Sequence, residues 1–470
     1  MISINQNELS LKLNNSNFTA VITNSEKNMN SISIPISVNY QSQDYAITSI
    51  DNKAFMQNYQ IESVYFPENT ELLTIGKYAF SESSLKSISI PASVTKIGEA
   101  CFSRCTHLES VEFPIDSKLK QLYKNTFFST KIERLFIPSS IEELKDGWCD
   151  NTPKLNKIIV SPSNKKFSFI DNKYLIGKSD ILNNGFYDTF YMVRRDIEKV
   201  IVPSFITKIA AYAMSDCTSL KTVDFSFDGN LKTIGKFAFF SSSIVFTSLP
   251  PSLKELGSSC FANCLSLKAV HFHDDSKLTE IEEMTFYNTS IEKVSIPRNI
   301  RKICSNAFAF CKNLRSIQFM KNSELTSINS ECFQFSAIEY ISIPKTVTTI
   351  GKSAFYNCDK LKEIQFQSDS ELTSIGESAF ENSSIEHISV PCGVTRLEDC
   401  SFFGCAALVC AEFLGSSMMI GSRCFRGAHE LWLVAFPNSS NIKMWKNSIC
   451  DAPSDFTVFA CANAKIDVDY

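Results

Sequence analysis

The chain has 470 residues, of which 44% are hydrophobic, and its 46 Lys and Arg nearly balance its 50 Asp and Glu. This balance argues against a nucleic-acid partner, whose binding surface would be clearly basic. No run of about 18 or more apolar residues occurs, so we expect no membrane insertion by this chain. Phe is abundant at 38 whereas Trp numbers only 3, an imbalance that calls for a structural cause.

Residues 1–50 are predicted to form an N-terminal cap and the first strand of a repeat array. Ile32–Pro35 reads ISIP and Ile47–Phe55 reads ITSIDNKAF, two fragments that recur more fully downstream. A cap is expected because the end face of an array would otherwise be exposed and apolar. The first ten residues are polar and lack the basic and apolar regions of a secretory signal.

Residues 51–450 are predicted to form the array itself. Three segments that begin at Ile291, Ile338 and Ile385 share the pattern I-x-x-I/V-S-I/V-P and start 47 residues apart. Longer relatives of the pattern lie between them, with a turn of the type D/N-S-x-L inserted. The anchor aromatics recur at alternating steps of 25 and 22 residues within two stretches, the first with Phe55, Phe80, Phe102 and Phe127, the second with Phe239, Phe261, Phe286, Phe308, Phe333, Phe355, Phe380 and Phe402, and Phe425 follows after a step of 23. Together with Cys149, Leu175, Met214 and Ile449, which fit the anchor position less well, they indicate about 17 rungs.

Each repeat contains two predicted elements. The L-x-x-I-x-I part alternates with period two and indicates a short strand. The I-G-x-x-A-F-x-x-C part indicates a helical turn, in which Phe355 and Cys358 share a face. One rung cannot bury both faces alone, so stacking is required and the Phe side chains form a ladder. The predicted fold is an α/β solenoid of about 17 rungs, with a parallel sheet on one face and short helical turns on the other.

An insertion of about 177–195 interrupts the array. The step from Cys149 to Met214 is 65 residues, which exceeds the usual pair of rungs. The Asn183-Asn184-Gly185 sequence is a turn signal between more apolar flanks, so we predict a hairpin. After residue 450 the sequence is polar and rich in small residues, and 451–470 is predicted to be a C-terminal cap or tail.

The repeat resembles the BspA-like leucine-rich-repeat family. Ile88–Phe102 (ISIPASVTKIGEACF) and Ile341–Cys358 match its pattern almost position for position, and Val160–Gly177 resembles a variant rung with a hairpin that such proteins often contain. The family occurs in mucosal anaerobic bacteria and is expanded in parasitic protists. The resemblance implies a leucine-rich-repeat solenoid that serves as a surface antigen or adhesin and binds host or microbial proteins.

The cysteines that recur every 47 residues are predicted to be buried free thiols. Five of the 17 lie 47 residues apart, which places them two rungs apart at about 10 Å. A disulfide needs Cα atoms within about 7 Å, so this ladder cannot pair with itself. The free thiols and the absence of a signal favour a cytoplasmic location, whereas the family resemblance favours the cell surface. The five are Cys217, Cys264, Cys311, Cys358 and Cys405.

No enzyme, cofactor or metal site is predicted. The sequence has no C-x-x-C pair, Gly-rich phosphate loop, nucleophile elbow or zincin motif. His271 and His273 face the same way in one predicted strand and could begin a metal site, but no third ligand is indicated. We therefore predict no catalytic residues, no cofactor-binding residues and no metal ligands, and interpret the two histidines as exposed side chains.

A candidate protein-binding surface lies near the insertion. Most outward strand positions are small or polar, but three rungs there combine basic and apolar residues, and the insertion adds aromatics. The candidate residues are Arg134, Phe136, Lys157, Ile159, Lys199 and Ile201 on the strands, with Phe186, Tyr187, Phe190 and Tyr191 in the insertion. The alternative is that the insertion folds over the patch. Binding would then be sought on the polar rungs around Tyr340, Glu363 and His387.

The predicted function is therefore protein binding without catalysis, with a host, microbial or self protein as the partner. Two interpretations remain open. The first is a cell-surface adhesin or antigen, and the second is an intracellular scaffold with the same fold that mediates protein–protein interactions.

Overall fold

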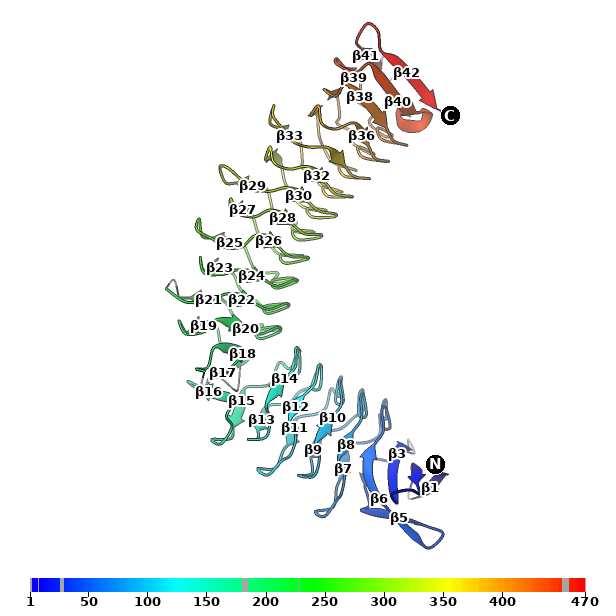
Figure 1. Ribbon diagram of the computed structural model, residues 1–470, viewed down its shortest axis with the longest axis vertical. Coiled ribbons are helices and arrows are strands. Elements are labelled where there is room, and N and C mark those ends of the chain that lie inside the picture. The colour runs from blue at the N-terminus through cyan, green and yellow to red at the C-terminus, as the bar shows by residue number, and fades with distance from the viewer. Residues whose placement is uncertain are drawn as a thin grey trace. The chain divides into compact units, whose positions relative to one another are not determined.

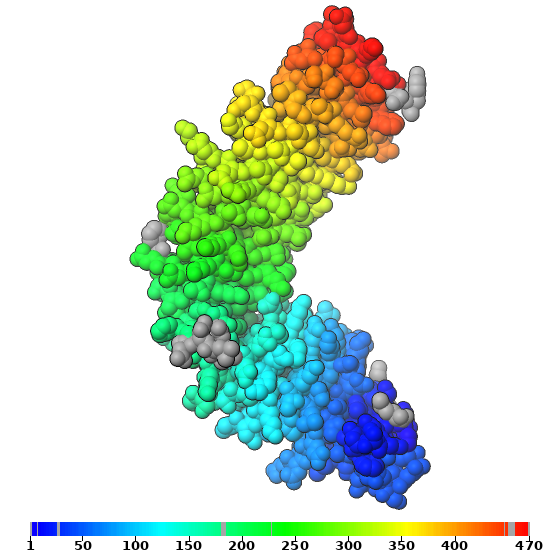
Figure 2. Space-filling view, in the orientation of Figure 1, coloured from blue at the N-terminus to red at the C-terminus, as the bar shows by residue number. Residues whose placement is uncertain are grey.

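The computed structural model describes residues 2–6, 8–25, 29–179, 185–226, 228–449 and 456–469. They divide into two compact units, the first comprising Met1–Glu198 and Lys208–Leu220, the second Lys199–Thr207 and Lys221–Tyr470. In each unit the chain coils into successive rungs that stack on one another (Figure 1). Figure 2 shows the rungs of each unit as adjoining bands of colour, because every rung packs against the next.

The first unit begins with strands that pair antiparallel. The strands of this sheet are β1 (Ile2–Gln6), β2 (Leu9–Asn14), β3 (Thr19–Ser25), β5 (Ser37–Tyr40), β6 (Gln43–Ile50), β8 (Thr74–Ile75) and β10 (Lys96–Ile97). β1 pairs with β2, β2 with β3, and β5 with β6, all antiparallel. The sheet then continues in parallel from β3 through β6, β8 and β10. Leu9, Leu11 and Leu13 alternate along β2 and are buried, so one face of this sheet covers the core of the first rungs.

A second sheet of the first unit is parallel throughout. In the described residues it has the order β15-β13-β11-β9-β7-β4. Its strands are β4 (Ser31–Ser33), β7 (Ser63–Tyr65), β9 (Ser87–Ser89), β11 (Ser110–Glu112), β13 (Arg134–Ile137) and β15 (Lys157–Val160), while β12 (Gln121–Leu122) pairs with β14 (Glu143–Leu144) on the other side of the rungs. The central residue of the short strands is buried and its neighbours face outward, as period-two alternation requires.

A three-stranded antiparallel segment follows at the place of the predicted insertion. Its strands are β16 (Phe167–Ile170), β17 (Tyr174–Gly177) and β18 (Thr189–Val193), and β18 pairs in parallel with β20 (Lys208–Ile209). The hairpin β17–β18 flanks the predicted turn, of which Asn183 and Asn184 lie outside the described residues. Phe190 and Met192 of β18 are buried, so β18 takes the place that a rung strand has elsewhere.

The second unit contains a long parallel sheet that starts with β19. The described strands of this sheet are β19 (Lys199–Val202), β21 (Thr222–Phe225), β23 (Phe246–Leu249), β25 (Ala269–Phe272), β27 (Lys293–Ile296), β29 (Ser316–Phe319), β31 (Tyr340–Ile343), β33 (Glu363–Phe366), β35 (His387–Val390), β37 (Cys410–Phe413), β39 (Leu433–Phe436) and β41 (Thr457–Ala460). Each strand is one rung from the next, and the six- and twelve-stranded sheets together agree closely with the predicted count of about 17 rungs.

The other side of the second unit has shorter parallel strands. They are β22 (Thr233–Ile234), β24 (Glu255–Leu256), β26 (Glu280–Ile281), β28 (Lys302–Ile303), β30 (Ser327–Ile328), β32 (Thr349–Ile350), β34 (Ser374–Ile375), β36 (Arg396–Leu397), β38 (Ser417–Ile420), β40 (Asn441–Trp445) and β42 (Lys465–Asp469). The predicted C-terminal segment thus contributes β41 and β42, which pair in parallel with β39 and β40. A single turn of 3₁₀ helix, η1 (Lys446–Ile449), is the one helix in the described residues.

The helical turn predicted for each rung is wrong, because the segment consists of successive β-turns. Ser353 and Asn357 have φ of 52° and 53°, in the left-handed region that interrupts a helix. The backbone N–H groups also alternate between two kinds of partner, the carbonyl three residues back and the next rung. In the rung of Phe355 the inter-rung bonds run from Ser353 to Glu377, from Phe355 to Ala379 and from Asn357 to Glu381, each 2.8 Å. Stacking therefore takes the donors that a helix would use internally.

The anchor aromatics are buried as predicted and form a stacked ladder within each unit. All thirteen are 0–1% exposed. Their rings stack from Phe55 to Phe127 in the first unit and from Phe239 to Phe425 in the second, with centroids 4.8–5.9 Å apart. The excess of Phe in the composition therefore has a structural cause, because each ring completes the core of its own rung and covers the next one.

The cysteine ladder is also buried and unpaired, as predicted. Cys264, Cys311, Cys358 and Cys405 are fully buried free thiols. Each donates a hydrogen bond to the backbone carbonyl of the anchor Phe of the preceding rung, at 3.0–3.1 Å. Burial raises the pKa of the Cys358 thiol to about 12, so it stays protonated and unreactive at neutral pH.

Candidate functional site

Four of the predicted binding residues lie together on the sheet of the first unit. The parallel register of β13 and β15 sets Arg134 beside Lys157 and Phe136 beside Ile159. Ile159 is 47% exposed, whereas Phe136 is partly buried and packs against the core. A guanidinium nitrogen of Arg134 lies 3.8 Å from a carboxylate oxygen of Glu112 on β11. This exposed ion pair partly neutralises the charge of Arg134. The insertion therefore does not seal this part of the patch.

The other two strand residues of the predicted patch belong to the second unit. Lys199 and Ile201 lie on β19, and Ile201 is 57% exposed. The Nζ of Lys199 is 2.6 Å from a carboxylate oxygen of Asp224 on β21. Ile201 thus remains accessible, and Lys199 has a partner on its own sheet.

The aromatics of the insertion take different roles in the structure. Phe190 is fully buried with its ring 5.2 Å from that of Tyr174, so it is a core residue that a partner cannot reach, contrary to its predicted role. Tyr191 is partly buried with its ring 5.1 Å from Phe167, and burial raises its pKa to about 12. Phe186 is 89% exposed, and Tyr187 lies under the Lys178 ammonium at 5.5 Å. Of the insertion, Phe186 is the side chain best placed to meet a partner.

A buried arginine follows the hairpin, and the sequence analysis did not identify its role. Arg195 is 3% exposed, and its guanidinium donates to the carbonyls of Ser215 at 2.7 Å and Cys149 at 3.3 Å. The Ser215 hydroxyl donates to Asp150 at 2.7 Å, and burial together with Asp150 raises the pKa of Asp216 to about 6. This polar cluster is enclosed, so we interpret it as a structural support of the first unit.

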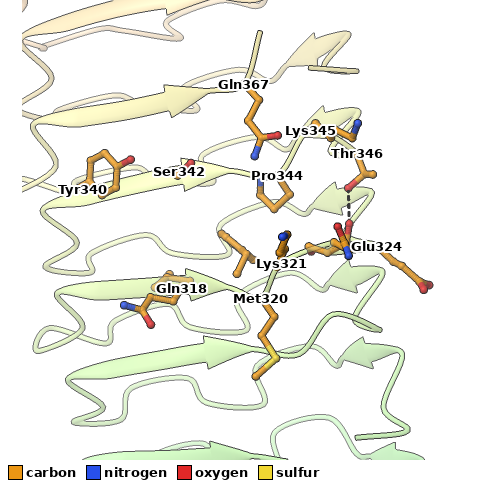
Figure 3. A pocket seen from close by; sticks show the side chains of 14 residues that line it. Gln318, Met320, Lys321, Glu324, Tyr340, Ser342, Pro344, Lys345, Thr346 and Gln367 are labelled. Atoms are coloured by element: carbon orange, nitrogen blue, oxygen red, sulfur yellow. Dashed lines mark hydrogen bonds between the residues drawn. The ribbon is translucent and has the colours of Figure 1, made fainter. Parts of the chain in front are cut away.

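The second unit has a groove on the face of its long sheet, with a volume of about 760 Å³ (Figure 3). It lies between the rungs of β29 and β31. The loop that follows β29, residues 320–324, belongs to one of the longer rungs and rises beside the strands; we call it the long-rung loop. Its lining is formed by Ile317, Gln318, Phe319, Met320, Lys321, Asn322, Ser323, Glu324, Tyr340, Ser342, Pro344, Lys345, Thr346 and Gln367. Tyr340 is among the residues named above as the alternative location for binding.

The groove is held in shape by hydrogen bonds between its two rungs. The hydroxyl of Thr346 donates to the carbonyls of Ser323 at 3.1 Å and Leu325 at 2.7 Å, which ties the loop to the next rung. Tyr340 is 43% exposed, and its hydroxyl donates to the side-chain oxygen of Gln365 on β33. An aromatic ring, a thioether from Met320 and several amide groups therefore line one concavity, and ligand-binding pockets combine apolar surface with a few polar groups in this way.

Potential metal ligands gather at one place in the described residues, which the sequence analysis missed. Glu280, Glu282 and Cys304 bring their donor atoms within 4.8 Å of one another. The group does not include His271, whose Nδ1 lies 3.2 Å from the Ser248 hydroxyl. In the same described residues, no helix has the length and apolar character needed to cross a membrane.

Comparison with known proteins shows what the chain is similar to. The family model for the BspA type leucine-rich repeat region matches residues 48–175, 186–315, 232–341, 279–409 and 326–450. The crystal structure of the pneumococcal vaccine antigen PcpA is 19% identical, with a TM-score of 0.57 over 84% of this chain and 93% of that chain. A leucine-rich-repeat protein from Eubacterium ventriosum is 20% identical, with a TM-score of 0.58 over 82% of this chain and 96% of that chain. No curated protein matches.

Proposed function

Because the chain belongs to the BspA-type leucine-rich-repeat family, we propose that it is a non-catalytic protein-binding protein, a cell-surface adhesin or antigen that recognises host or microbial proteins. The observation that carries the proposal is the groove on the sheet face of the second unit. Repeat proteins bind partners along such extended faces, where side chains can vary without disturbing the core.

The groove suits an extended segment of a partner protein. Tyr340 offers a half-exposed aromatic ring at the groove, and such rings are frequent anchors of protein interfaces. Met320, in the loop that follows β29, supplies an adaptable apolar contact to the same groove. The amides of Gln318 and Gln367 can donate to and accept from a partner's backbone. The partner therefore contributes one apolar side chain and its polar main chain.

We predict that Tyr340→Ser weakens binding by about thirtyfold, equivalent to about 2 kcal/mol for the loss of an aromatic anchor. Peptides would be selected from a random display library on the immobilised wild-type chain. Their dissociation constants would then be measured by calorimetry on both proteins. Tyr59→Ser is the matched control, because Tyr59 is 63% exposed and lies in the other unit. Equal affinities for wild type and the Tyr340 variant would contradict the groove as the site.

The paired residues Phe136 and Ile159 on the sheet of the first unit form the second docking surface that we propose, and Ile201 in the second unit is proposed as a separate contact residue. Ile159 and Ile201 are exposed apolar side chains on strands that carry basic residues. An Ile159→Ser variant measured with the same peptides separates this surface from the groove, and an Ile201→Ser variant is measured on its own. If peptides lose affinity for Ile159→Ser and keep it for Tyr340→Ser, they bind the surface formed by Phe136 and Ile159 and not the groove.

The location of the protein distinguishes the proposed adhesin from an intracellular scaffold of the same fold. The name of PcpA as a vaccine antigen supports surface display. The buried free thiols favour the scaffold, because reduced cysteines are usual inside cells. We expect a membrane-impermeant biotin reagent to label the protein on intact cells. Labelling that occurs only after lysis would contradict the cell-surface adhesin and favour the intracellular scaffold.

A further inference from the structure

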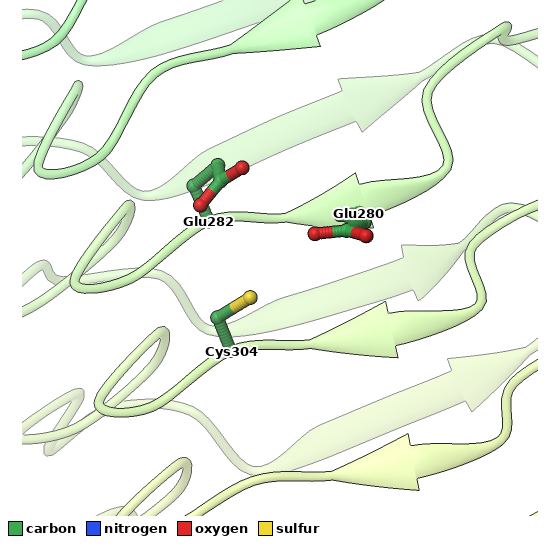
Figure 4. A group of neighbouring side chains, drawn as sticks. All are labelled: Glu280, Glu282 and Cys304. Carbon is green, nitrogen blue, oxygen red and sulfur yellow. The ribbon is translucent and has the colours of Figure 1, made fainter.

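Two carboxylates and a thiol meet between the rungs of β26 and β28 in the second unit. Glu280 lies on β26, Glu282 follows that strand, and Cys304 follows β28 on the next rung (Figure 4). One donor atom from each side chain lies within 4.8 Å of the other two. Glu280 is exposed, Glu282 is partly buried and Cys304 is 7% exposed. The group thus runs from the surface to the edge of the core.

Glu282 and Cys304 occupy a position that is glycine in many other rungs. A Cβ added to Gly257 would lie 2.4 Å from the backbone nitrogen of Lys236, and one added to Gly351 would lie 2.5 Å from that of Ser330. A side chain at this position is therefore directed at the preceding rung. The rung that precedes Cys304 carries Glu282 at the same position, and the thiol sulfur lies within 4.8 Å of a Glu282 carboxylate oxygen.

The Cys304 thiol differs from the buried thiols of the anchor ladder. Cys311 and Cys358 each donate to a backbone carbonyl at 3.1 Å. Within the described residues the backbone N–H of Cys304 donates to the carbonyl of Ile281, but its thiol makes no hydrogen bond, although Cys304 is only 7% exposed. The sulfur points toward the two carboxylates (Figure 4). A buried polar group that lacks a partner and points at two anionic oxygens suggests a ligand that is shared among them.

The surrounding charge favours a cation. Glu280, Glu282 and Glu283 lie close enough to act electrostatically on Cys304, and so does the basic residue Lys302. Lys302 lies opposite Glu280 in the parallel register of β26 and β28. Three carboxylates against one ammonium leave the group net negative, so a divalent cation would relieve the repulsion between the carboxylates.

We propose that Glu280, Glu282 and Cys304 bind a thiophilic divalent cation of the zinc type. The cation would take Sγ and one oxygen from each carboxylate, with water in a fourth position. Ligand distances of about 2.0–2.3 Å bring the donors to about 3.5 Å from one another, which side-chain rotation can achieve. The thiol proton leaves to solvent when the sulfur binds. The cation would join two consecutive rungs, a role that does not depend on the proposed binding function.

Cobalt(II) is the probe, because its bond to a thiolate gives a charge-transfer absorption that carboxylates alone do not give. We expect the full chain to bind one cobalt ion with this absorption, and zinc to displace it. Cys304→Ser should abolish the absorption. Glu282→Gln should keep it and weaken binding by roughly tenfold or more, since it removes one of three ligands. Cys392→Ser is the matched control, because Cys392 is an exposed free thiol outside the group.

The outcomes separate the site from adventitious binding. Absorption that is absent in the wild-type chain would overturn the proposal, as would absorption that survives Cys304→Ser or disappears in Cys392→Ser. Circular dichroism of each variant shows whether the rungs remain folded. The Glu282→Gln variant retains the thiol, so an unchanged cobalt affinity for this variant would also overturn the carboxylate part of the site.

Discussion

Phe355→Ala should lower the free energy of unfolding of its rungs by about 3–5 kcal/mol, as for other aromatic deletions in cores. Phe355 is fully buried, with ring centroids 5.3 Å from Phe333 and 5.4 Å from Phe380. The substitution leaves a cavity that the stacked neighbours cannot fill without breaking inter-rung hydrogen bonds. In a repeat array the damage should stay near this rung. Native-state hydrogen exchange measured rung by rung reports both the size and the spread of the effect.

Phe246→Ala is the control for this prediction, because Phe246 lies on the sheet face of the same unit and is 49% exposed. The Phe246→Ala substitution should lower the free energy of unfolding by less than about 1 kcal/mol. A loss below about 1 kcal/mol for Phe355→Ala would contradict the placement of the anchor in the core. A loss spread evenly over distant rungs would contradict coupling between nearest neighbours.

Arg195→Met should lower the stability of the first unit by about 3–5 kcal/mol. Methionine keeps much of the side-chain volume but leaves the carbonyls of Cys149 and Ser215 without the guanidinium donors that they now have. Burial raises the pKa values of the Asp150 and Asp216 carboxyls, and the substitution also removes the positive charge of Arg195 that offsets part of this rise. Urea unfolding at neutral pH, followed by circular dichroism, measures the loss.

Arg194→Met is the matched control at the neighbouring position. Arg194 lies at the surface, and its ion pair with Asp196 has a separation of 2.6 Å. Exposed pairs are worth about 0–1 kcal/mol, so this change should have a small effect. Equal losses for the two variants would show that the enclosed cluster contributes no more than an exposed ion pair.

The periodic part of the fold could be predicted from the sequence because one pattern repeats many times. Phe355 and Cys358 recur at fixed steps, so a single assignment of inward and outward positions applies to every rung. The turn segment was wrongly predicted to be helical, because a spacing of three and four residues between its apolar positions also suits a helix. The left-handed φ of Ser353 and Asn357 depends on the neighbouring rung, whose carbonyls accept their N–H groups.

The candidate sites were harder to predict because they depend on contacts between rungs. Phe190 was assigned to the surface on composition, yet the hairpin turns it against Tyr174 in the core. The groove beside Tyr340 depends on how far the long-rung loop at residues 320–324 rises, which residue types alone do not determine. Glu282 and Cys304 are 22 positions apart and match no ligand spacing along the chain. Their departure from the usual glycine was the available signal.

Hydrogen exchange of the chain with and without a selected peptide is the most direct test of the proposed binding function. We predict that the peptide slows exchange at the loop 320–324 and at 344–346, the two sides of the groove. Slower exchange confined to the turn segments on the opposite side of the rungs would contradict the account. Unchanged exchange around the groove at a saturating concentration of peptide would contradict it equally.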